Sequence, residues 1–425
     1  MMSVPTASKD RKARAREALV RCDALANFSE DANSLRRTFL SPPMHNCHAE
    51  IAAWLKLLGM SAKVDAVGNL RALYEGAKLD APRLLIGSHL DTVPNAGKYD
   101  GMLGVVLAVA LLEELDGRRF PFGIEVVGFS EEEGVRFGVP FIGSRALVGR
   151  VDAELLEQQD WNGISVREAI QQFGLDDRKI SEARLASSVF GYLEFHIEQG
   201  PVLEKLDRRL AAVEAIVGQT RLALRFLGKA NHAGTTPLDA RYDALAGAAE
   251  WINFVESRAK QIDGLVATVG SIEAKPGATN VIPGEVRLTL DVRHKADDVR
   301  SRAVQELAVR GAEIAKSRGL SFEWSTLLEQ NAVFMDDLMT RETEAAIQSS
   351  GYESHRMTSG AGHDAMILAE RVPSAMIFLR SPGGISHDPA EAVLLEDIEA
   401  AIEAGVHLLN RLADSKEFLG RMNRA

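Results

Sequence analysis

Histidines and acidic residues stand in short, turn-forming stretches at several separate points of the chain. His89 and Asp100 lie eleven positions apart in GSHLDTVPNAGKYDG, directly after an apolar run. The other stretches are FSEEEG with Glu131, Glu132 and Glu133, FHIEQG with His196, and SPGGISHDP with His387. Imidazole nitrogens together with carboxylate oxygens suit zinc, manganese or cobalt. Their number is enough for two divalent ions that share one bridging carboxylate, for which Asp100 is our candidate.

A pair of ions in such a site would do hydrolytic chemistry. Two ions about 3.5–4 Å apart activate water at neutral pH and polarise a carbonyl, as hydrolysis of a stable amide demands. An adjacent carboxylate must then move the proton, and in FSEEEG one glutamate can face the metal while its neighbour faces the attacking water. Asp91, two residues after His89, is placed to accept the second ring N–H of that histidine.

Each of these residues also has an ordinary explanation. A lone histidine in a loop is seldom a metal ligand, and three consecutive glutamates usually form a solvated turn. Their common placement after apolar runs is harder to explain in this way, because a soluble core has no reason to gather polar side chains there. The pattern by itself therefore indicates a metal site and no more specific function.

The apolar runs that precede these residues are the elements that must position them. Four runs are apolar on both faces, as buried parallel strands are, and they span residues 83–90, 122–129, 191–197 and 374–379. A helix-like segment at 104–115 lies between the first two. In open α/β sheets, ligands bind outside the carboxyl ends of the strands. We therefore expect an α/β fold with a mostly parallel sheet, whose carboxyl edge carries the polar residues.

The region from about 217 to 329 has a different pattern. TRLALRFLG and EVRLTLDVR alternate apolar and polar residues, as antiparallel strands with one exposed face do, and two helix-like segments accompany them. This change predicts a smaller α+β domain inserted into the first. The expected boundaries are 1–215 and 331–425 for the two parts of the larger domain and 216–330 for the insertion.

Composition restricts the class of protein. The chain has 425 residues, 46% of them hydrophobic, which is enough for two domains with buried cores. Its 60 acidic and 49 basic residues give a net charge of -11, which opposes binding to nucleic acid or anionic membranes and is compatible with a metal. With two cysteines, no secretory signal and no long apolar segment, we expect a cytoplasmic protein without disulfides or membrane spans.

Other motifs are set aside. GAGHDA at 360–365 has the spacing of a dinucleotide-binding loop, but it follows HRMTS and not a buried strand, so its required context is missing. The chain has neither a phosphate-binding P-loop motif nor a serine-hydrolase elbow. Five further histidines have no strand-end context and are expected to be surface or helix residues: His45, His48, His294, His355 and His407.

An ordered series of motifs resembles one known family along the chain from about residue 20. The series is GSHLDTV, YDG, EEEGVRF, HIEQGPVLE, HAGTTP, NVIPGEV, DVRH, GAGHDA and GGISHDPAE. It resembles the amidase, hydantoinase and carbamoylase branch of the M20 metallopeptidase family. That branch includes allantoate amidohydrolases and N-carbamoyl-L-amino-acid hydrolases, which are two-domain, typically dimeric enzymes dependent on divalent metal. The resemblance implies a catalytic domain, an inserted lid and dimerisation domain, and a homodimer.

The resemblance also implies roles for the metal-site residues. His89, Asp100 and His196 would hold one ion, and Asp100, Glu133 and His387 the other. Glu132 would be the general base and acid, while the role of Glu131 is open. The peptidase branches usually have a carboxylate where this chain has His196, and this difference favours the carbamoylase branch.

Residues of the inserted domain receive roles from the same resemblance. His232 in NHAGTTP would stabilise the oxyanion on the attacked carbonyl, although such a histidine is also explained by hydrogen bonds to nearby threonines. Arg293 ends EVRLTLDVR on the face opposite its apolar residues, where a guanidinium can grip a carboxylate by two hydrogen bonds or be a solvated charge. The resemblance pairs Arg293 with other substrate-binding residues, namely Asn280, Gln199 and, more weakly, Gln219 and His363.

The expected function is hydrolysis of the linear ureido C–N bond of allantoate or an N-carbamoyl-L-amino acid, with two zinc, manganese or cobalt ions and release of ammonia and carbon dioxide. Three alternatives stay open. An M20-type peptidase or aminoacylase would use the same ions on a peptide or N-acyl amide. A non-catalytic binding protein of the same fold would keep the pocket without turnover. A structural or assembly protein would use the domain of alternating strands for contacts.

Overall fold

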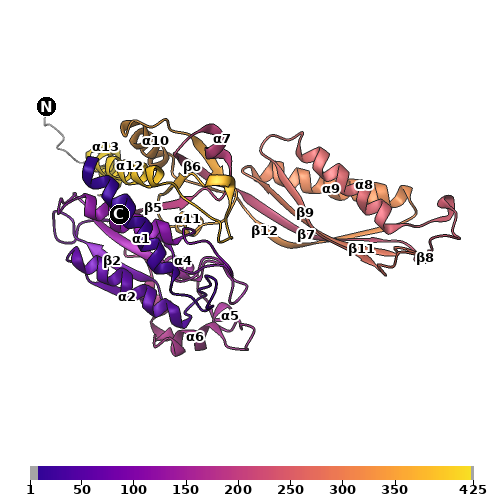
Figure 1. Ribbon diagram of the computed structural model, residues 1–425, viewed down its shortest axis with the longest axis horizontal. Coiled ribbons are helices and arrows are strands. Elements are labelled where there is room, and N and C mark those ends of the chain that lie inside the picture. The colour runs from indigo at the N-terminus through magenta and orange to yellow at the C-terminus, as the bar shows by residue number, and fades with distance from the viewer. Residues whose placement is uncertain (1–7, 423–425) are drawn as a thin grey trace. The chain divides into compact units, whose positions relative to one another are not determined.

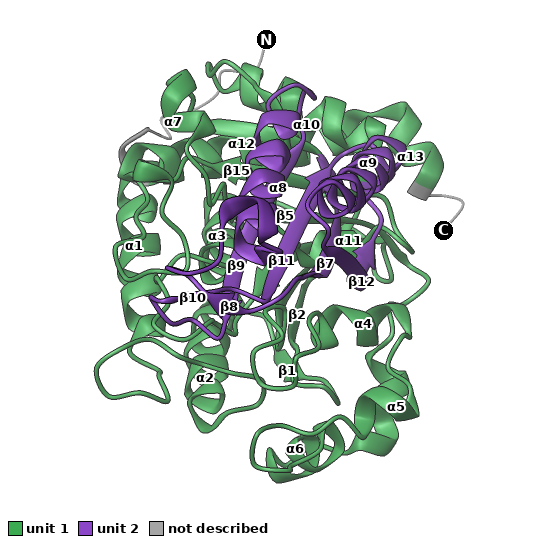
Figure 2. Cartoon of the chain, turned by 90° about the vertical axis from the view of Figure 1, so that its right-hand side faces the viewer, with its two compact units in different colours: residues 1–214, 334–425 green, residues 215–333 purple. Residues whose placement is uncertain are grey.

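The computed structural model describes residues 8–422, which form two compact units. Unit 1 combines the residues up to Glu214 with those from Phe334 onward, and unit 2 consists of Ala215–Val333 (Figure 2). The insertion of one unit into the other is the arrangement that the change of hydrophobic pattern predicts.

Unit 1 is built on a nine-stranded sheet (Figure 1). Its strands are β1 (Ala62–Val64), β2 (Leu70–Tyr74), β3 (Arg83–His89), β4 (Gly123–Phe129), β5 (Val189–Ile197), β6 (Leu210–Ile216), β13 (Val333–Phe334), β14 (Arg356–Ser359) and β15 (Ser374–Leu379). Their order is β1-β2-β4-β3-β5-β15-β6-β13, with β14 beside β6. The four central strands β4, β3, β5 and β15 are parallel to one another, whereas β2 and β6 pair with them antiparallel. The predicted α/β fold with a mostly parallel sheet is confirmed.

Helices cover this sheet. They are α1 (Ser8–Ala26), α2 (Pro42–Leu57), α3 (Met102–Glu114), α4 (Ile142–Val148), α5 (Ala153–Leu156), α6 (Val166–Gln172), α7 (Val202–Leu206), α10 (Asp337–Ser349), α11 (Asp364–Leu368), α12 (Leu395–Asp414) and α13 (Lys416–Met422), with 3₁₀ turns η1 (Asp177–Ala183) and η3 (Pro382–Gly384). The apolar helix α3 packs on β3 and β5, and α1 and α12 pack against it in turn. This burial on all sides explains why α3 has no polar face.

Unit 2 has a four-stranded antiparallel sheet in the order β12-β7-β11-β9. Its elements are β7 (Gly218–Leu227), β8 (Asn231–His232), η2 (Leu238–Ala240), α8 (Ala244–Ala259), β9 (Val266–Lys275), β10 (Val281–Ile282), β11 (Glu285–His294), α9 (Asp297–Ser317) and β12 (Ser321–Gln330). The alternate residues Val286, Leu288, Leu290 and Val292 of β11 are buried in a core with α8 and α9. The period-two pattern thus marks the strands whose one face the helices cover.

One smaller prediction was confirmed and one was wrong. GAGHDA does not follow a buried strand, because the short strand before it, β14, is only partly buried, and α11 follows it. His294 is neither a surface nor a helix residue, because it is the last residue of β11 and is 7% exposed. Its ring nitrogens lie within hydrogen-bond distance of the carbonyl oxygens of Ala296 and Asp263, and these contacts explain why an imidazole is tolerated there.

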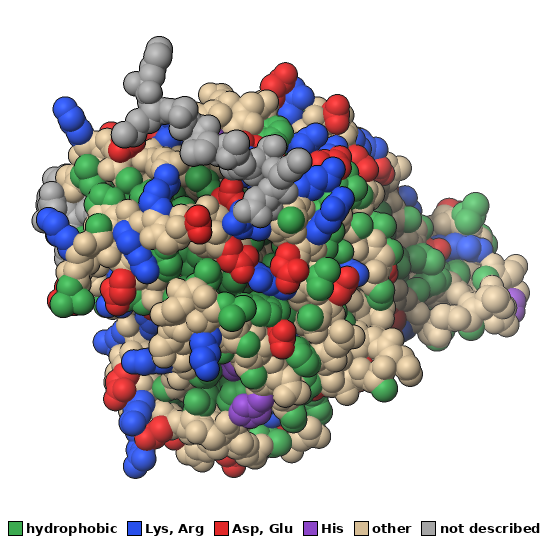
Figure 3. All heavy atoms as spheres, turned by 60° about the vertical axis from the view of Figure 1, so that its left-hand side comes forward, with side chains coloured by type: hydrophobic (Ala, Val, Ile, Leu, Met, Phe, Trp, Pro, Cys, Tyr) green, Lys and Arg blue, Asp and Glu red, His purple; other side chains and the backbone are tan. Residues whose placement is uncertain are grey.

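No helix within residues 8–422 is long and apolar enough to cross a membrane. On the face drawn in Figure 3, basic and acidic side chains are interspersed over the surface.

Candidate metal centre

The polar residues that follow the central strands meet at one edge of the sheet in unit 1. His89 ends β3, the three glutamates follow β4, and His196 is the last residue but one of β5. His387 lies in the loop after β15, and Asp100 lies between β3 and α3. Because these four strands are parallel, their carboxyl ends lie at the same edge.

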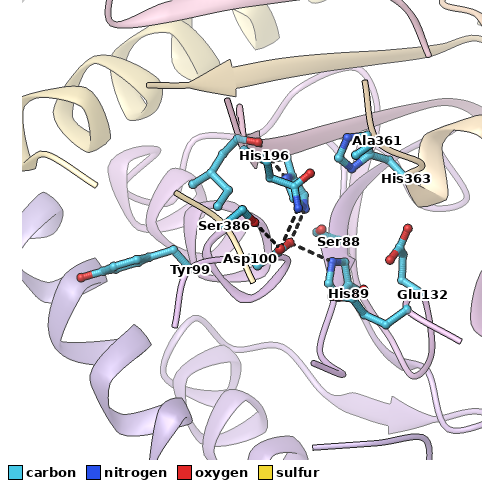
Figure 4. A network of polar contacts seen from close by, with 12 residues as sticks. Ser88, His89, Tyr99, Asp100, Glu132, His196, Ala361, His363 and Ser386 are labelled. Carbon is cyan, nitrogen blue, oxygen red and sulfur yellow. Dashed lines mark hydrogen bonds and ion pairs between the residues drawn. The ribbon is translucent and has the colours of Figure 1, made fainter. Parts of the chain in front are cut away.

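Asp100 lies at the middle of this cluster, between His89 and His196 (Figure 4). Its Oδ1 atom is 3.1 Å from Nε2 of His196 and 3.5 Å from Nε2 of His89. Its Oδ2 atom is 3.3 Å from Nε2 of His387, which in turn is 3.8 Å from Oε1 of Glu133. The two oxygens of one carboxylate therefore face two different sets of side chains.

Three groups of side chains each bring their nitrogen and oxygen atoms within 4.8 Å of one another. They are His89, Asp100 and His196; Asp100, Glu133 and His387; and His89, Glu132 and Glu133. The first two groups contain all five residues expected to bind metal, and metal binding by them stays a prediction. The third places Glu132, which is 8% exposed, beside the same centre.

Charge is poorly balanced in this cluster, in which His89, Asp100 and His196 are buried and His387 is exposed. Burial raises the pKa of Glu132 well above its usual range, and burial together with the charge of Asp100 raises the pKa of Glu133 to about 7. Burial also acts on Asp100, but the three imidazoles around it hold its pKa well below the usual range. The contact with Asp100 raises the pKa of His387 to about 9. A divalent cation would stabilise the ionised carboxylates here.

Two buried atoms support a cation at this place. Asp100 Oδ1 and His196 Nε2 face each other, yet neither makes a hydrogen bond of acceptable geometry. Buried polar atoms without partners are rare and costly. In His89 and His196, the second ring nitrogen lies beside a backbone carbonyl oxygen. Nδ1 of His89 is 3.0 Å from the carbonyl oxygen of Asp91, and Nδ1 of His196 is 2.9 Å from the carbonyl oxygen of Ile197. This arrangement presents both Nε2 atoms for metal, so the donor set fits the expected ions.

Asp91 holds the glutamate turn more directly than it holds His89. Its carboxylate oxygens accept the backbone N–H groups of Glu132 at 2.9 Å and of Glu133 at 3.1 Å. Its Oδ1 atom lies 3.5 Å from Nδ1 of His89, further than its own carbonyl oxygen. The expected contact with the ring is thus made chiefly by the backbone of Asp91, and the side chain instead fixes the turn after β4.

Close packing fixes His89 against the next loop. Gly101 has φ +68°, and a Cβ added to it would lie 2.4–2.5 Å from atoms of the His89 ring. Only glycine fits between this imidazole and the start of α3. The YDG motif thus has two roles. Asp100 brings its carboxylate next to His89, and Gly101 leaves room for the ring of the same histidine.

Gln199 and His363 also lie at this site. Gln199 has φ +58° and donates from Nε2 to Oδ2 of Asp100 at 2.7 Å. His363 is 1% exposed, its Nε2 lies 2.8 Å from Oγ of Ser359, and its ring centroid is 4.4 Å from that of His196. His387, like Gln199, has a left-handed backbone with φ +57°. Such strain in residues other than glycine concentrates at functional sites.

Some residues of the centre were missed from the sequence. Glu194 is fully buried on β5 and accepts hydrogen bonds from Ser88 Oγ at 2.8 Å and from the Ala365 N–H at 2.9 Å. A carboxylate inside the apolar run GYLEFHI was a usable signal, because a charged group is buried only with partners. Glu391 is also buried at this site, and nothing in its sequence neighbourhood distinguishes it.

The remaining predicted residues belong to unit 2. His232 is exposed on β8, and its Nδ1 atom accepts the N–H of Gly234 at 3.1 Å. The hydroxyl of Thr236 donates to the backbone carbonyl of His232 at 2.8 Å and not to its ring. The carbonyl of Asn280 accepts the N–H of Ala233 at 2.9 Å, which joins the turn before β10 to the loop after β8.

Arg293 and Gln219 are register partners on β11 and β7, so their side chains lie on the same face of that sheet. Arg293 forms an ion pair with Asp291 at 2.9 Å, and Gln219 donates to Gln330 at 2.7 Å. The substrate-binding roles expected of these unit 2 residues stay predictions.

Comparison with known proteins gives a consistent set of relatives. The model of the family described as "Peptidase family M20/M25/M40" matches residues 85–411. An allantoate deiminase from Arabidopsis thaliana is 39% identical over 419 residues, which cover 91% of this chain and 80% of that protein. An N-carbamoyl-L-amino acid amidohydrolase from Geobacillus stearothermophilus is also 39% identical, over 86% of this chain and 90% of its own length.

A solved structure has the same fold over nearly the whole chain. It is an amidase of the hydantoinase/carbamoylase family from Burkholderia multivorans, with a TM-score of 0.88 and 30% sequence identity. The similarity covers 93% of this chain and 97% of that one.

Proposed function

Since the chain belongs to peptidase family M20/M25/M40, we propose that it is a metal-dependent amidohydrolase acting on a linear ureido C–N bond. The substrate is allantoate or an N-carbamoyl-L-amino acid, and the products include ammonia and carbon dioxide. The relatives named for these two substrates support the substrate class. The observation that carries the chemistry is the meeting of three imidazoles and two carboxylates around Asp100.

The side chains of the two groups around Asp100 would hold two divalent ions. His89, Asp100 and His196 would bind one ion, and Asp100, Glu133 and His387 would bind the other. Zinc, manganese and cobalt all suit this mixture of nitrogen and oxygen donors. When bound, such ions activate water and polarise the carbonyl that is attacked.

Glu132 moves the proton in this proposal. Its carboxylate belongs to the same cluster as His89 and Glu133, and it stands on a turn that Asp91 fixes through the backbone. It accepts a proton from the attacking water and returns one to the leaving nitrogen as the C–N bond breaks. The carbamate or carbamic acid fragment then decomposes to ammonia and carbon dioxide, which balances the addition of one water to the ureido group.

The residues proposed for the substrate's carboxylate end are those that the family resemblance implies. Arg293 offers a planar guanidinium, and its register partner Gln219 lies on the same face of the sheet. Asn280 and Gln199 would add hydrogen bonds to the substrate, His363 would line the same pocket, and His232 would stabilise the oxyanion on the attacked carbonyl.

The two units have different roles in this proposal. Unit 1 is the catalytic domain, and unit 2 is a lid and dimerisation domain. The edge strand β9 of unit 2 supports a homodimer, because its Val266 and Ile272 side chains are 57% and 51% exposed. Mass measurement by light scattering after size exclusion would give twice the chain mass for a dimer.

A substrate panel tests the proposed activity. The protein is loaded with manganese, zinc or cobalt and assayed for ammonia with allantoate, ureidoglycolate, β-ureidopropionate and several N-carbamoyl-L-amino acids. N-acyl amino acids and dipeptides are included, with detection of the free amino acid. We expect ammonia from at least one ureido acid, whereas release of amino acid from the acyl or peptide substrates alone would favour a peptidase or aminoacylase.

Glu132→Gln is the matched catalytic variant, because it removes the proton acceptor while keeping the size of the side chain. We expect kcat to fall by about 10²–10⁴-fold. Circular dichroism and metal content should stay those of the unmodified protein. Unchanged turnover in the variant would show that Glu132 does not move the proton, and a metal-loaded protein inactive on every substrate would favour a non-catalytic binder.

A further inference from the structure

Glu391 is a buried carboxylate in the loop that follows His387. It is 4% exposed, and its Oε1 atom accepts the backbone N–H of Tyr99 at 2.8 Å and that of Asp100 at 3.0 Å. It lies 291 residues from Asp100 in the chain. A single side chain after β15 thus fixes the backbone of the loop between β3 and α3, at the residue that occupies the middle of the metal centre.

Ser386 completes the connection between these loops. Its hydroxyl donates to Oδ2 of Asp100 at 3.1 Å and lies 3.4 Å from Oε2 of Glu391. Asp100 is therefore held through its backbone by Glu391 and through its side chain by Ser386 (Figure 4 labels Ser386 and Asp100). The same loop carries His387, so both sides of one expected ion site are fixed relative to each other.

Gly97 makes room for this carboxylate. A Cβ added to Gly97 would lie 2.4 Å from Cβ of Glu391 and 2.5 Å from its Cδ and Oε1 atoms. The neighbouring backbone therefore has to lack a side chain for Glu391 to reach the two N–H groups. The loop before Asp100 and the carboxylate after His387 are fitted to each other at two independent points.

Glu391 has a different role from the expected ligands. Within residues 8–422 it belongs to none of the three groups whose donor atoms come together. Its Oε1 atom is already engaged by two backbone N–H groups. These contacts orient Asp100 and leave the carboxylate oxygens of Asp100 turned toward His196 and His387.

We propose that Glu391 is a positioning residue, which holds Asp100 so that the two carboxylate oxygens of Asp100 can each bind an ion. Gly97 leaves the space that the Glu391 carboxylate occupies. This inference rests on the proposed function, because it assumes that Asp100 bridges the ions. Partners that orient a ligand typically contribute about 10–100-fold to metal affinity. The hydrogen bonds require an acceptor oxygen at this position and not a negative charge as such.

Metal affinity without turnover tests this role. Metal-free protein is titrated with Co²⁺, Zn²⁺ and Mn²⁺ in competition with a chelating dye, and the visible absorption of the cobalt form is recorded. For Glu391→Ala we expect about 10–100-fold weaker binding and an altered cobalt spectrum. For Glu391→Gln, whose amide oxygen can still accept both N–H groups, we expect an affinity much closer to that of the unmodified protein.

Two further variants keep the test decisive. Gly97→Ala retains the carboxylate of Glu391 but fills the space that this carboxylate occupies, so it should weaken metal binding as Glu391→Ala does. If Glu391→Ala fails to fold, Gly97→Ala takes its place in the test. Asp243→Ala is the matched control, because Asp243 also accepts two backbone N–H groups, from Leu245 and Ala246, but at the start of α8 in unit 2. It should leave metal affinity unchanged.

The outcomes separate this inference from the proposed function. Tight metal binding in the unmodified protein with equally tight binding in folded Glu391→Ala and Gly97→Ala would overturn the positioning role alone. Equal weakening in Glu391→Gln and Glu391→Ala would also overturn it, since the charge and not the acceptor would then be what acts. A protein that binds none of the three ions would overturn the metal centre and this inference together.

Discussion

Replacing Asp91 by alanine should destabilise the protein and disorganise the turn that carries Glu132. The Asp91 side chain is 1% exposed and accepts two backbone N–H groups, those of Glu132 at 2.9 Å and Glu133 at 3.1 Å. Each buried N–H group left without a partner costs about 1–3 kcal/mol. Asp91→Ala should therefore lower the free energy of unfolding by about 2–6 kcal/mol. Asp91→Asn keeps one acceptor oxygen and should lower it by about half as much.

Urea unfolding followed by circular dichroism measures this free energy. The control is Asp298→Ala, whose exposed carboxylate forms an i,i+4 ion pair with Arg302 and should change stability by no more than about 0.5 kcal/mol. In Asp91→Ala protein that remains folded, kcat should also fall, because Glu132 loses its fixed position. A change in unfolding free energy below about 0.5 kcal/mol for Asp91→Ala, no larger than a surface substitution gives, would refute the reasoning.

Three further predictions follow from other contacts. Gly101→Ala should displace the His89 ring and weaken metal binding measured by chelator competition, because the added Cβ would lie 2.4–2.5 Å from ring atoms; unchanged affinity would contradict this. Burial lowers the pKa of His48 to about 3 from its ordinary 6.5, so the folded state favours the neutral ring and loses stability as pH falls through this window. His48 alone should thus contribute a fall of about 1.4 kcal/mol per pH unit to the unfolding free energy between about pH 6 and pH 4. The unfolding free energy of His48→Leu should therefore change with pH by a slope that differs from that of the unmodified protein by this amount, and equal slopes would contradict the assignment to His48. Removal of metal by a chelator should lower the melting temperature reversibly, since an ion at about 100 times its Kd stabilises the fold by about 2.7 kcal/mol; an unchanged melting temperature would argue against bound metal.

The sequence predicted the fold and the meeting of the site residues for one physical reason. The runs that became β3, β4, β5 and β15 are apolar on both faces, which is the pattern of buried parallel strands. Parallel strands have their carboxyl ends at one edge, so residues at the ends of these runs had to come together. The helix expected at 104–115 became α3, which begins earlier, at Met102.

The contacts that orient the site could not be predicted in the same way. Glu391 acts on the backbone N–H of a residue 291 positions away, and a backbone group has no signal in the sequence. The side chain of Asp91 likewise reaches the backbone of the glutamate turn and not chiefly the His89 ring. Gly97 leaves room for the side chain of Glu391, and Gly101 leaves room for the ring of His89. These close approaches can be recognised only once the loops are folded.

The number of bound ions tests the central claim most directly. Mass spectrometry of metal-loaded, dialysed protein should find two divalent ions per chain in the unmodified protein, about one in His387→Ala and almost none in Asp100→Ala, because Asp100 belongs to both groups of donor atoms. An Asp100→Ala protein that is folded and still binds two ions per chain would contradict the account.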